Sequence, residues 1–271
     1  MKYSSVLVTG ASSGIGRACA ELLAVRGYSV FGVSRQFPPD MHPDVRCFEA
    51  DVNDGESISN AIGKATQASG GALDVVINAA GFGVAGPIEA TPIEDARAQL
   101  ETNFFGVVRV SQMVLPSMRR KRRGLIVNIG SLAGFVALPY QGFYAASKFA
   151  LEGYSETLAM EVRAFNVHVA LVEPGDFRTG FTAKRRHVPL DAVDADYREH
   201  FEQTITAAAQ SELDAEEPKR VAELVAAILE EPVAKIRYPI GSPHEIAYVT
   251  ADLLAKAEVV KASGPGSRDR E

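Results

Sequence analysis

Short apolar runs rich in β-branched residues alternate with longer helix-like patterns along most of the chain. Several runs are apolar on both faces, which is typical of strands buried inside a parallel sheet. The alternation predicts an α/β fold: a single domain over residues 1–260, built as a doubly wound, mostly parallel sheet with helices on both faces. Seven strands are predicted, at Val6–Val8, Ser29–Val33, Val45–Glu49, Val75–Asn78, Leu125–Ile129, Val167–Val172 and Lys235–Pro239. Helices are predicted between them, at Gly14–Arg26, Gly55–Ser69, Ile93–Met118, Tyr144–Phe165 and Pro218–Leu229.

Two segments depart from this alternation. Residues 176–214 follow the turn Glu173-Pro-Gly175, are polar and charged, and contain no strand-like run. Because this segment leaves the carboxyl edge of the sixth strand, where doubly wound sheets bind their ligands, we expect it to form a substrate lid. Residues 261–271 are rich in glycine, serine and charged residues, and we expect them to be disordered.

The charge balance narrows the range of partners. The 271 residues carry a formal net charge of −6, which argues against general binding to nucleic acid or to an anionic membrane surface. No run approaches the roughly 20 apolar residues that span a bilayer, and the N-terminus enters a strand without a signal-like apolar region. We therefore expect a cytoplasmic protein that acts on a small molecule. The two cysteines and five histidines show no metal-ligand spacing, and no metal is expected.

One basic run, Arg119-Arg-Lys-Arg-Arg123, could instead indicate binding to nucleic acid or to an anionic lipid. It falls between a predicted helix end and a predicted strand start, where cations complement the helix dipole. We favour a solvated helix terminus for this run.

A glycine-rich turn follows the first predicted strand and opens the first helix. Its sequence, Thr9-Gly-Ala-Ser-Ser-Gly-Ile-Gly16, lets the backbone approach a pyrophosphate whose charge the helix N-terminus would favour. The spacing differs from the usual G-x-G-x-x-G dinucleotide fingerprint, so an ordinary tight turn is the alternative. The predicted cofactor-binding residues in this turn are Gly10, Ser12, Ser13, Gly14, Ile15 and Gly16.

The end of the second strand favours NADP (NADPH) over NAD as the cofactor. An acidic residue at this distance from the glycine turn would bind the ribose hydroxyls of NAD, whereas arginine accommodates the 2′-phosphate of NADP. The chain has Ser34-Arg35 there and no competing carboxylate, although a lone arginine at a strand end is also common as a merely solvated side chain. The ends of the third and fourth strands supply further predicted cofactor contacts: Asp51, Val52, Asn78, Ala79, Ala80 and Gly81.

Tyr144 and Lys148 lie four residues apart on a predicted helix and therefore share one face. A fixed ammonium lowers the pKa of a neighbouring phenol from its usual value of about 10 toward the neutral range, where a general acid or base works best. Alone, such a pair is common by chance. Ser131, which follows the fifth strand, could hydrogen-bond a substrate oxygen or merely cap the next segment.

Taken in order, these motifs together with Asn103 and Pro174-Gly175 resemble the motif set of the short-chain dehydrogenase/reductase family over most of residues 4–180. The stretch Tyr144-Ala-Ala-Ser-Lys-Phe-Ala-Leu-Glu-Gly153 is similar to the branch that contains 17β-hydroxysteroid and retinol dehydrogenases. The resemblance implies a Rossmann-type fold and NADP-linked hydride transfer between a ketone or aldehyde and an alcohol. Family members commonly form homodimers or homotetramers through the two long helices, so an oligomer is expected.

The resemblance also implies residue roles. Tyr144 would be the general acid and base, Ser131 would stabilise the substrate oxygen, and Asn103 would hold a water in a proton relay from Lys148. The implied catalytic set is Asn103, Ser131, Tyr144 and Lys148. The residues implied to contact the cofactor near the nicotinamide are Tyr144, Lys148, Pro174, Gly175, Phe177 and Thr179.

Apolar residues concentrate around these catalytic segments and could line a pocket for a fairly apolar carbonyl compound. The predicted pocket residues are Phe82, Phe135, Leu138, Tyr140, Phe143 and Phe181. A non-catalytic protein that senses dinucleotides or acts as a scaffold on the same fold is the alternative, and the complete catalytic set argues against it.

Overall fold

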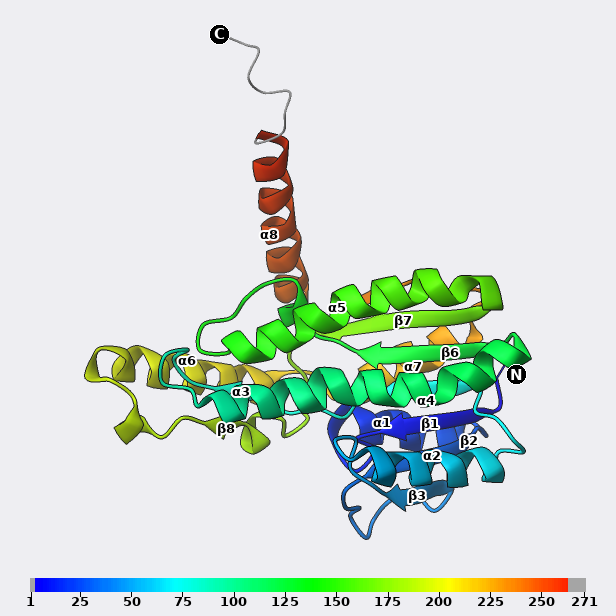
Figure 1. Ribbon diagram of the computed structural model, residues 1–271. Helices are drawn as coiled ribbons and strands as arrows, with labels where there is room; N and C mark the ends of the chain where they lie inside the picture. The colour runs from blue at the N-terminus through cyan, green and yellow to red at the C-terminus, as the bar shows by residue number, and fades with distance from the viewer. Residues whose placement is uncertain (1–2, 263–271) are drawn as a thin grey trace.

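Seven strands form one sheet in the order β3-β2-β1-β4-β6-β7-β9, and every neighbouring pair is parallel (Figure 1). The structure is a computed structural model that describes residues 3–262, with side chains to residue 256. The seven strands are β1 (Ser5–Thr9), β2 (Ser29–Ser34), β3 (Val45–Glu49), β4 (Val75–Asn78), β6 (Gly124–Ile129), β7 (Val167–Pro174) and β9 (Arg237–Ile240). The predicted fold class is confirmed.

Helices cover both faces of the sheet (Figure 1). On one face, α1 (Gly14–Val25) and α7 (Lys219–Glu230) pack together over side chains of alternate strand positions such as Val6 and Val8. On the other, α2 (Gly55–Ala68), α4 (Gly106–Lys121) and α5 (Gly142–Val162) cover the intervening positions, including Leu7. Because successive strand residues point to opposite faces, the all-apolar runs supply both cores at once.

The order of the strands reverses between β1 and β4, because the chain runs outward to β3 and then returns to the centre. A crevice opens at such a switch point, at the carboxyl ends of the strands. The first strand ends at Thr9, the fourth at Asn78, β6 at Ile129 and β7 at Pro174. The segments predicted to hold cofactor and substrate therefore meet at one edge.

The segment 176–214 is more structured than expected. It contains β8 (Arg186–His187), which pairs with β5 (Val84–Ala85), and a long helix α6 (Ala195–Asp214). The expectation of no strand was wrong, because a two-residue strand is too short to give an apolar run. Helix α6 and β8 extend beyond the end of the main sheet, as Figure 1 shows.

The predicted helix Ile93–Met118 is interrupted. It consists of α3 (Ile93–Leu100), a π-helical turn (Glu101–Phe105) and α4, and the turn contains Asn103. Such wide turns insert a residue into a helix and occur often at functional sites.

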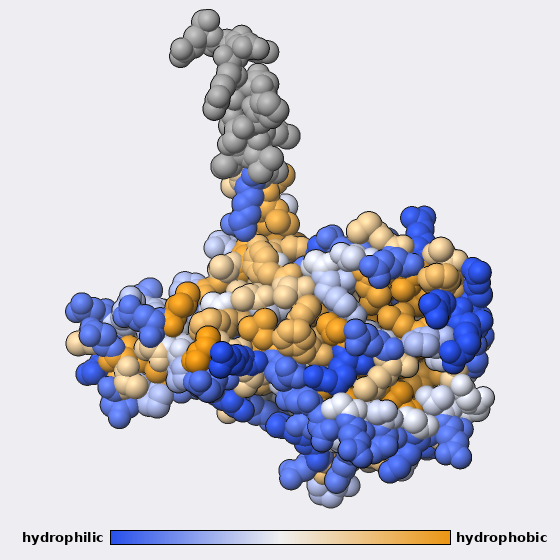
Figure 2. All heavy atoms as spheres, viewed as in Figure 1, coloured by the Kyte–Doolittle hydropathy of each residue, from blue (hydrophilic) through white to orange (hydrophobic). Residues whose placement is uncertain are grey.

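A last helix, α8 (Pro243–Ala262), was not predicted. It projects from the body of the protein (Figure 1). Leu253 and Leu254, half-way along this helix, are exposed, and Figure 2 shows further apolar surface around the base of the helix. The tail expected to be disordered begins in the last two residues of α8 and otherwise lies outside the described residues. Between residues 3 and 262, no helix is both long and apolar enough to cross a membrane.

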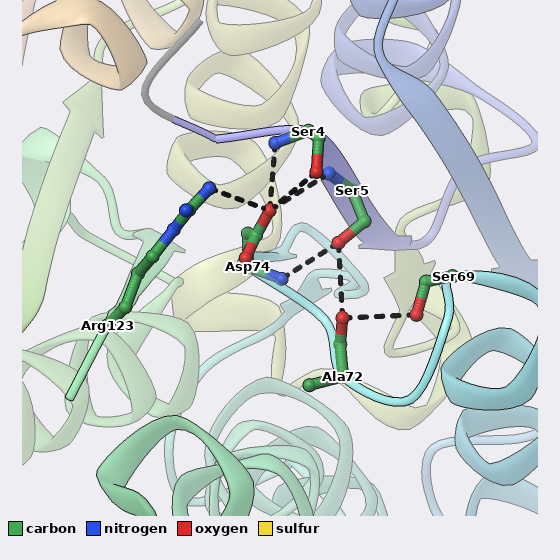
Figure 3. A network of polar contacts seen from close by, with 6 residues as sticks. All are labelled: Ser4, Ser5, Ser69, Ala72, Asp74 and Arg123. Atoms are coloured by element: carbon green, nitrogen blue, oxygen red, sulfur yellow. Dashed lines mark hydrogen bonds and ion pairs between the residues drawn. The ribbon is translucent and has the colours of Figure 1, made fainter. Parts of the chain in front are cut away.

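The edge of the sheet opposite the switch point is held by a buried carboxylate. Asp74 Oδ2 accepts hydrogen bonds from the backbone N–H and the hydroxyl of Ser4, at 2.8 and 2.9 Å, and pairs with Arg123 at 3.2 Å (Figure 3). Arg122 donates to the carbonyl oxygen of Ala164 at 2.7 Å. The basic run thus ends helix α4, as favoured, and two of its five arginines and lysines already bind groups of the protein.

Candidate active site

A cavity of about 860 Å³ opens at the carboxyl ends of the central strands. It is lined by the turns that follow β1 and β4, by the ends of β2, β6 and β7, and by residues of α5, α8 and the segment 176–214. Most of the residues predicted for cofactor, substrate and catalysis share this wall: Gly10, Ser12, Ser13, Gly14, Ile15, Gly16, Ser34, Arg35, Asp51, Val52, Ala79, Ala80, Gly81, Phe82, Ser131, Leu138, Tyr144, Lys148, Pro174, Gly175, Phe177, Thr179 and Phe181.

The glycine turn leaves no room for a Cβ atom at Gly10 or at Gly16. Gly10 has φ +66°, and a Cβ there would lie 2.8 Å from the backbone of Ala80. A Cβ on Gly16 would lie 2.4 Å from the carbonyl oxygen of Gly10. Ser13 is the N-cap of α1, yet its side chain makes no cap hydrogen bond to the first turn. The turn therefore offers close backbone approach and a helix N-terminus, the features that suit a pyrophosphate.

The adenosine end of a dinucleotide would meet the end of β2. Ser34 closes that strand, and its hydroxyl lies 2.8 Å from the hydroxyl of Ser12 in the glycine turn. Arg35 is exposed on the cavity wall next to it. The nearest acid that follows along the chain, Asp40, pairs with Arg17 at 3.1 Å.

The turn after β4 is held in place by hydrogen bonds to the end of the neighbouring strand β1. The hydroxyl of Thr9, which was not predicted as a site residue, accepts hydrogen bonds from the N–H groups of Ala79 and Ala80 at 3.1 and 3.3 Å. Asn78 does not line the cavity: its side chain is buried and donates to Asn128 Oδ1 at 2.9 Å. Its part is to support the turn that Ala79 and Ala80 present.

The two candidate catalytic hydroxyls both belong to residues of the cavity wall. Ser131 is near enough to Tyr144 to lower its pKa, and the oxygen of the Ser131 hydroxyl accepts a hydrogen bond from the N–H of Ala133 at 3.1 Å. Burial raises the pKa of Tyr144, and Ser131 and the charge of Arg185 oppose this rise. The phenol is therefore protonated at neutral pH, whereas the sequence had predicted a lowered pKa.

Lys148 lies behind the phenol. Its ammonium is 5.7 Å from the centre of the Tyr144 ring and donates to the carbonyl oxygen of Ile129 at 2.9 Å. Burial lowers the pKa of Lys148 to about 8, and the carboxylate of Glu152 opposes this lowering. The ammonium thus lies against the Tyr144 ring, and its charge is lost in the mildly alkaline range.

Asn103 lies beside the cavity, not on its wall. Its side-chain oxygen accepts from the N–H of Phe82 and its amide donates to the carbonyl of Phe82, both at 3.0 Å. The amide also donates to the hydroxyl of Ser147 at 3.2 Å. Asn103 thereby ties the segment after β4 to helix α5, and every polar atom of its side chain is engaged in doing so.

A buried group of charges beneath the catalytic helix escaped the sequence analysis. Arg237 of β9 pairs through Nη1 with Glu152 of α5 and with Glu173 of β7, the latter at 3.1 Å, and through Nη2 with Glu156 at 2.8 Å. Burial and the charge of Glu152 raise the pKa of Glu173 to about 8. Glu152 follows Tyr144 and Lys148 at intervals of four residues, so it lies on the same face of the helix. This spacing could have identified Glu152 from the sequence.

The segment 176–214 adds an acid, Glu212, that is already hydrogen-bonded within the protein. Glu212 of α6 accepts from the hydroxyl of Thr179 at 2.9 Å and from the N–H groups of Phe181 and Thr182 at 2.8 and 2.7 Å. These bonds fold the 179–182 loop over the cavity, and the ring of Phe181 lies 5.6 Å from that of Tyr144. Glu212 was not predicted as a site residue, because nothing in its sequence spacing marks it as one.

Three predicted pocket aromatics do not line the cavity. Phe143 precedes Tyr144 on α5, and consecutive helical residues point about 100° apart. The ring of Tyr140 packs against Phe201 of α6, and its hydroxyl bonds His200 at 2.7 Å. Phe135 lies under the guanidinium of Arg237, 4.9 Å away. These three residues are close to the candidate catalytic residues in the sequence, but their rings do not line the cavity.

The comparisons with known proteins agree with this arrangement. The family model for short chain dehydrogenases matches residues 4–189. The chain belongs to this family. As a short chain dehydrogenase it is an oxidoreductase of alcohol and carbonyl groups, in a family that binds nicotinamide dinucleotides.

Relatives of this short chain dehydrogenase cover nearly its whole length. It is 40% identical to 3-ketodihydrosphingosine reductase of Bacteroides thetaiotaomicron over 89% of each chain. It is 32% identical to 17-beta-hydroxysteroid dehydrogenase type 1 of Homo sapiens over 95% of this chain and 89% of that protein, which agrees with the predicted branch. The structure of a short-chain dehydrogenase from Streptomyces avermitilis matches with a TM-score of 0.84 at 28% identity and covers 99% of this chain and 98% of that one.

Proposed function

We propose that the protein is an NADP(H)-dependent reductase that interconverts a ketone or aldehyde with its alcohol, with Tyr144 as the general acid and base. The observation that carries the proposal is that Tyr144 and Ser131, which lie near enough for Ser131 to lower the pKa of Tyr144, line the same cavity as the glycine turn. Two hydroxyls that lie close together can both contact one carbonyl oxygen.

A bound nicotinamide supplies the hydride to the carbonyl carbon. Tyr144 donates its phenolic proton to the carbonyl oxygen, so that C=O becomes CH–OH, and removes the same proton in the reverse direction. Ser131 donates a hydrogen bond to that oxygen while negative charge develops on it. Because burial raises the pKa of Tyr144, the proton is in place at neutral pH, which favours reduction. Lys148 stabilises the phenolate that remains after the proton has left.

Cofactor choice follows from the end of β2. Arg35 is positioned to meet a 2′-phosphate, and no carboxylate lies between Ser34 and Asp40 to repel it. A charge-assisted hydrogen bond between a guanidinium and a phosphate is among the stronger polar contacts in proteins. These features support a preference for NADPH over NADH.

We further propose a substrate whose body is apolar. The wall of the cavity includes the apolar side chains of Phe82, Leu138, Phe181, Val136 and Val249, which would contact the body of a lipophilic ligand. The two relatives are named for 3-ketodihydrosphingosine and for a 17-beta-hydroxysteroid, which is consistent with such a pocket.

Oxidation of NADPH and of NADH, followed by absorbance with a panel of steroid ketones, retinal, long-chain ketones and small diketones, tests the proposal. We expect turnover of at least one apolar carbonyl compound, with kcat/KM at least about 10-fold higher for NADPH than for NADH. Tight NADPH binding without turnover of any member would contradict the catalytic proposal and favour a dinucleotide sensor.

A further inference from the structure

Arg185 is a cation on the cavity wall that the protein leaves without a hydrogen-bond acceptor. Its Nε and Nη1 atoms are buried and have no hydrogen-bond partner among the residues that the structure describes. Burial lowers the pKa of this guanidinium, and the charges of Glu212 and Asp176 oppose the lowering without accepting a hydrogen bond from the two buried nitrogens.

The acids that line the cavity around Arg185 do not accept a hydrogen bond from it, because each already accepts hydrogen bonds from other groups of the protein. Glu212 is saturated by two backbone N–H groups and a hydroxyl. Asp176 accepts from the hydroxyl of Ser211 at 2.5 Å. Glu245 accepts from the N–H groups of Asp176 and Ser242, both at 2.7 Å. The charge that still lacks a hydrogen-bond partner is therefore positive, and a ligand that completes the site must bring acceptor oxygens.

The position of Arg185 assigns it to the substrate side of the cavity. Its guanidinium lies 5.7 Å from the ring centre of Phe181, and that ring lies 5.6 Å from the ring of Tyr144. Its stem packs near Gly83, where a Cβ would lie 3.2 Å from Arg185 Cγ. The ring of Phe181 therefore lies near both the Arg185 guanidinium and the Tyr144 ring, and Arg185 belongs to the proposed lid.

We infer that Arg185 binds an anionic oxygen group of the substrate, so that the substrate is a carbonyl compound with an apolar body and a carboxylate or similar anion near the carbonyl. The inference rests on the proposed function. A guanidinium presents a planar fork that matches a carboxylate with two parallel hydrogen bonds. It discriminates sharply, since an uncharged analogue leaves the buried cation without a partner.

Matched pairs of aryl keto acids and their methyl esters test the inference. The acids 4-oxo-4-phenylbutyrate, 5-oxo-5-phenylvalerate and 6-oxo-6-phenylhexanoate place the carboxylate at increasing distance from the ketone. For the best spacing we expect kcat/KM to favour the acid over its ester by about 30-fold, the value of a hydrogen bond to a charged group. In Arg185→Met that ratio falls to within about 3-fold, and Arg185→Lys retains part of it.

The control is Arg178→Met, which removes the same charge from the lid at a residue that is exposed, paired with Glu217 and outside the cavity wall. It should leave the acid-to-ester ratio unchanged. Arg185→Met should keep its affinity for NADPH, measured by fluorescence titration, and a melting temperature at or above that of the wild type. Loss of NADPH affinity would instead assign Arg185 to a cofactor phosphate and overturn the inference.

Two further outcomes are distinguishable. If wild type reduces the esters as well as the acids, or if Arg185→Met lowers kcat on both equally, Arg185 acts through the pKa of Tyr144 or not at all, and the inference is wrong while the proposed function stands. If wild type reduces neither acids nor esters nor any carbonyl in the wider panel, the proposed function itself has failed.

Discussion

Replacing Arg237 by methionine should destabilise the protein in a manner that depends on pH. The guanidinium pairs with Glu152, Glu156 and Glu173, and the Glu173 side chain is fully buried. Removing one partner of a buried ion pair costs about 3 kcal/mol, because it leaves the opposite charge unpaired. Here all three carboxyls lose their cation, and two of them, Glu152 and Glu173, are buried, so at pH 8 we expect a loss of about 3 kcal/mol in the free energy of unfolding.

At lower pH the loss shrinks. The pKa of Glu173 is already raised to about 8 by burial and by Glu152, and loss of the arginine raises the pKa of both carboxyls further. Between pH 6 and 8 the folded variant then holds up to one proton more than the folded wild type, in which Glu173 is already largely protonated below pH 8, while the unfolded chains hold equal numbers. Its stability therefore falls more steeply with rising pH. One proton over two pH units corresponds to about 2.7 kcal/mol as an upper limit, so we expect a loss of about 1 kcal/mol at pH 6.

Reversible urea unfolding followed by circular dichroism at pH 6 and pH 8 measures both values. Arg220→Met is the control, since its pair with Glu216 is exposed and should be worth less than about 0.5 kcal/mol at either pH. Adding Glu173→Gln to Arg237→Met should recover stability at pH 8 and not at pH 6. A loss for Arg237→Met that is equal at the two pH values would refute the reasoning.

Three further predictions concern the cavity. Arg35→Asp should weaken NADPH binding by about 30-fold and NADH binding by less than about 3-fold in fluorescence titrations; equal changes would remove Arg35 from cofactor recognition. The reductase kcat/KM should fall as pH rises through about 8, where Lys148 loses its proton. Glu152→Gln should move that fall to lower pH, because it removes the carboxylate that raises the pKa of Lys148; an unshifted pH profile would contradict this. Gly16→Ala places a methyl group 2.4 Å from a backbone oxygen and should weaken NADPH binding by about 30-fold or more, whereas Gly63→Ala, with no neighbour within 4 Å, should have no effect on it.

The sheet and its crevice could be predicted because both follow from local patterns. All-apolar runs mark parallel strands, and parallel strands bring their carboxyl ends to one edge. Gly10, Ser131 and Tyr144 follow or lie near those ends in the chain, and the structure gathers them around one cavity.

Helix α8 and the buried charges could not be predicted in the same way, for different reasons. The start of α8 carries a capping box, in which Ser242 Oγ accepts from the N–H of Glu245 at 3.3 Å and the Glu245 carboxylate accepts from the N–H of Ser242 at 2.7 Å. The pattern Ser242-Pro-His-Glu245 was therefore a readable signal that was missed. Arg237 and Glu152 lie 85 positions apart, and only the fold decides that they meet.

Membership of the cavity wall also depends on side-chain direction, which sequence proximity does not give. Phe143 adjoins Tyr144 in the chain and yet does not line the cavity. Arg185 and Glu212 come from the segment 176–214, whose path the apolar pattern did not specify. The oligomeric state and the cytoplasmic location stay predictions.

The most direct test of the account is the kcat/KM of Tyr144→Phe for a carbonyl compound that the wild type reduces, measured with saturating NADPH. The substitution removes only the hydroxyl that is proposed to give its proton to the substrate oxygen. We predict a loss of at least about 100-fold with NADPH affinity within about 3-fold of wild type. Retention of the wild-type rate would show that another group supplies the proton and would contradict the account.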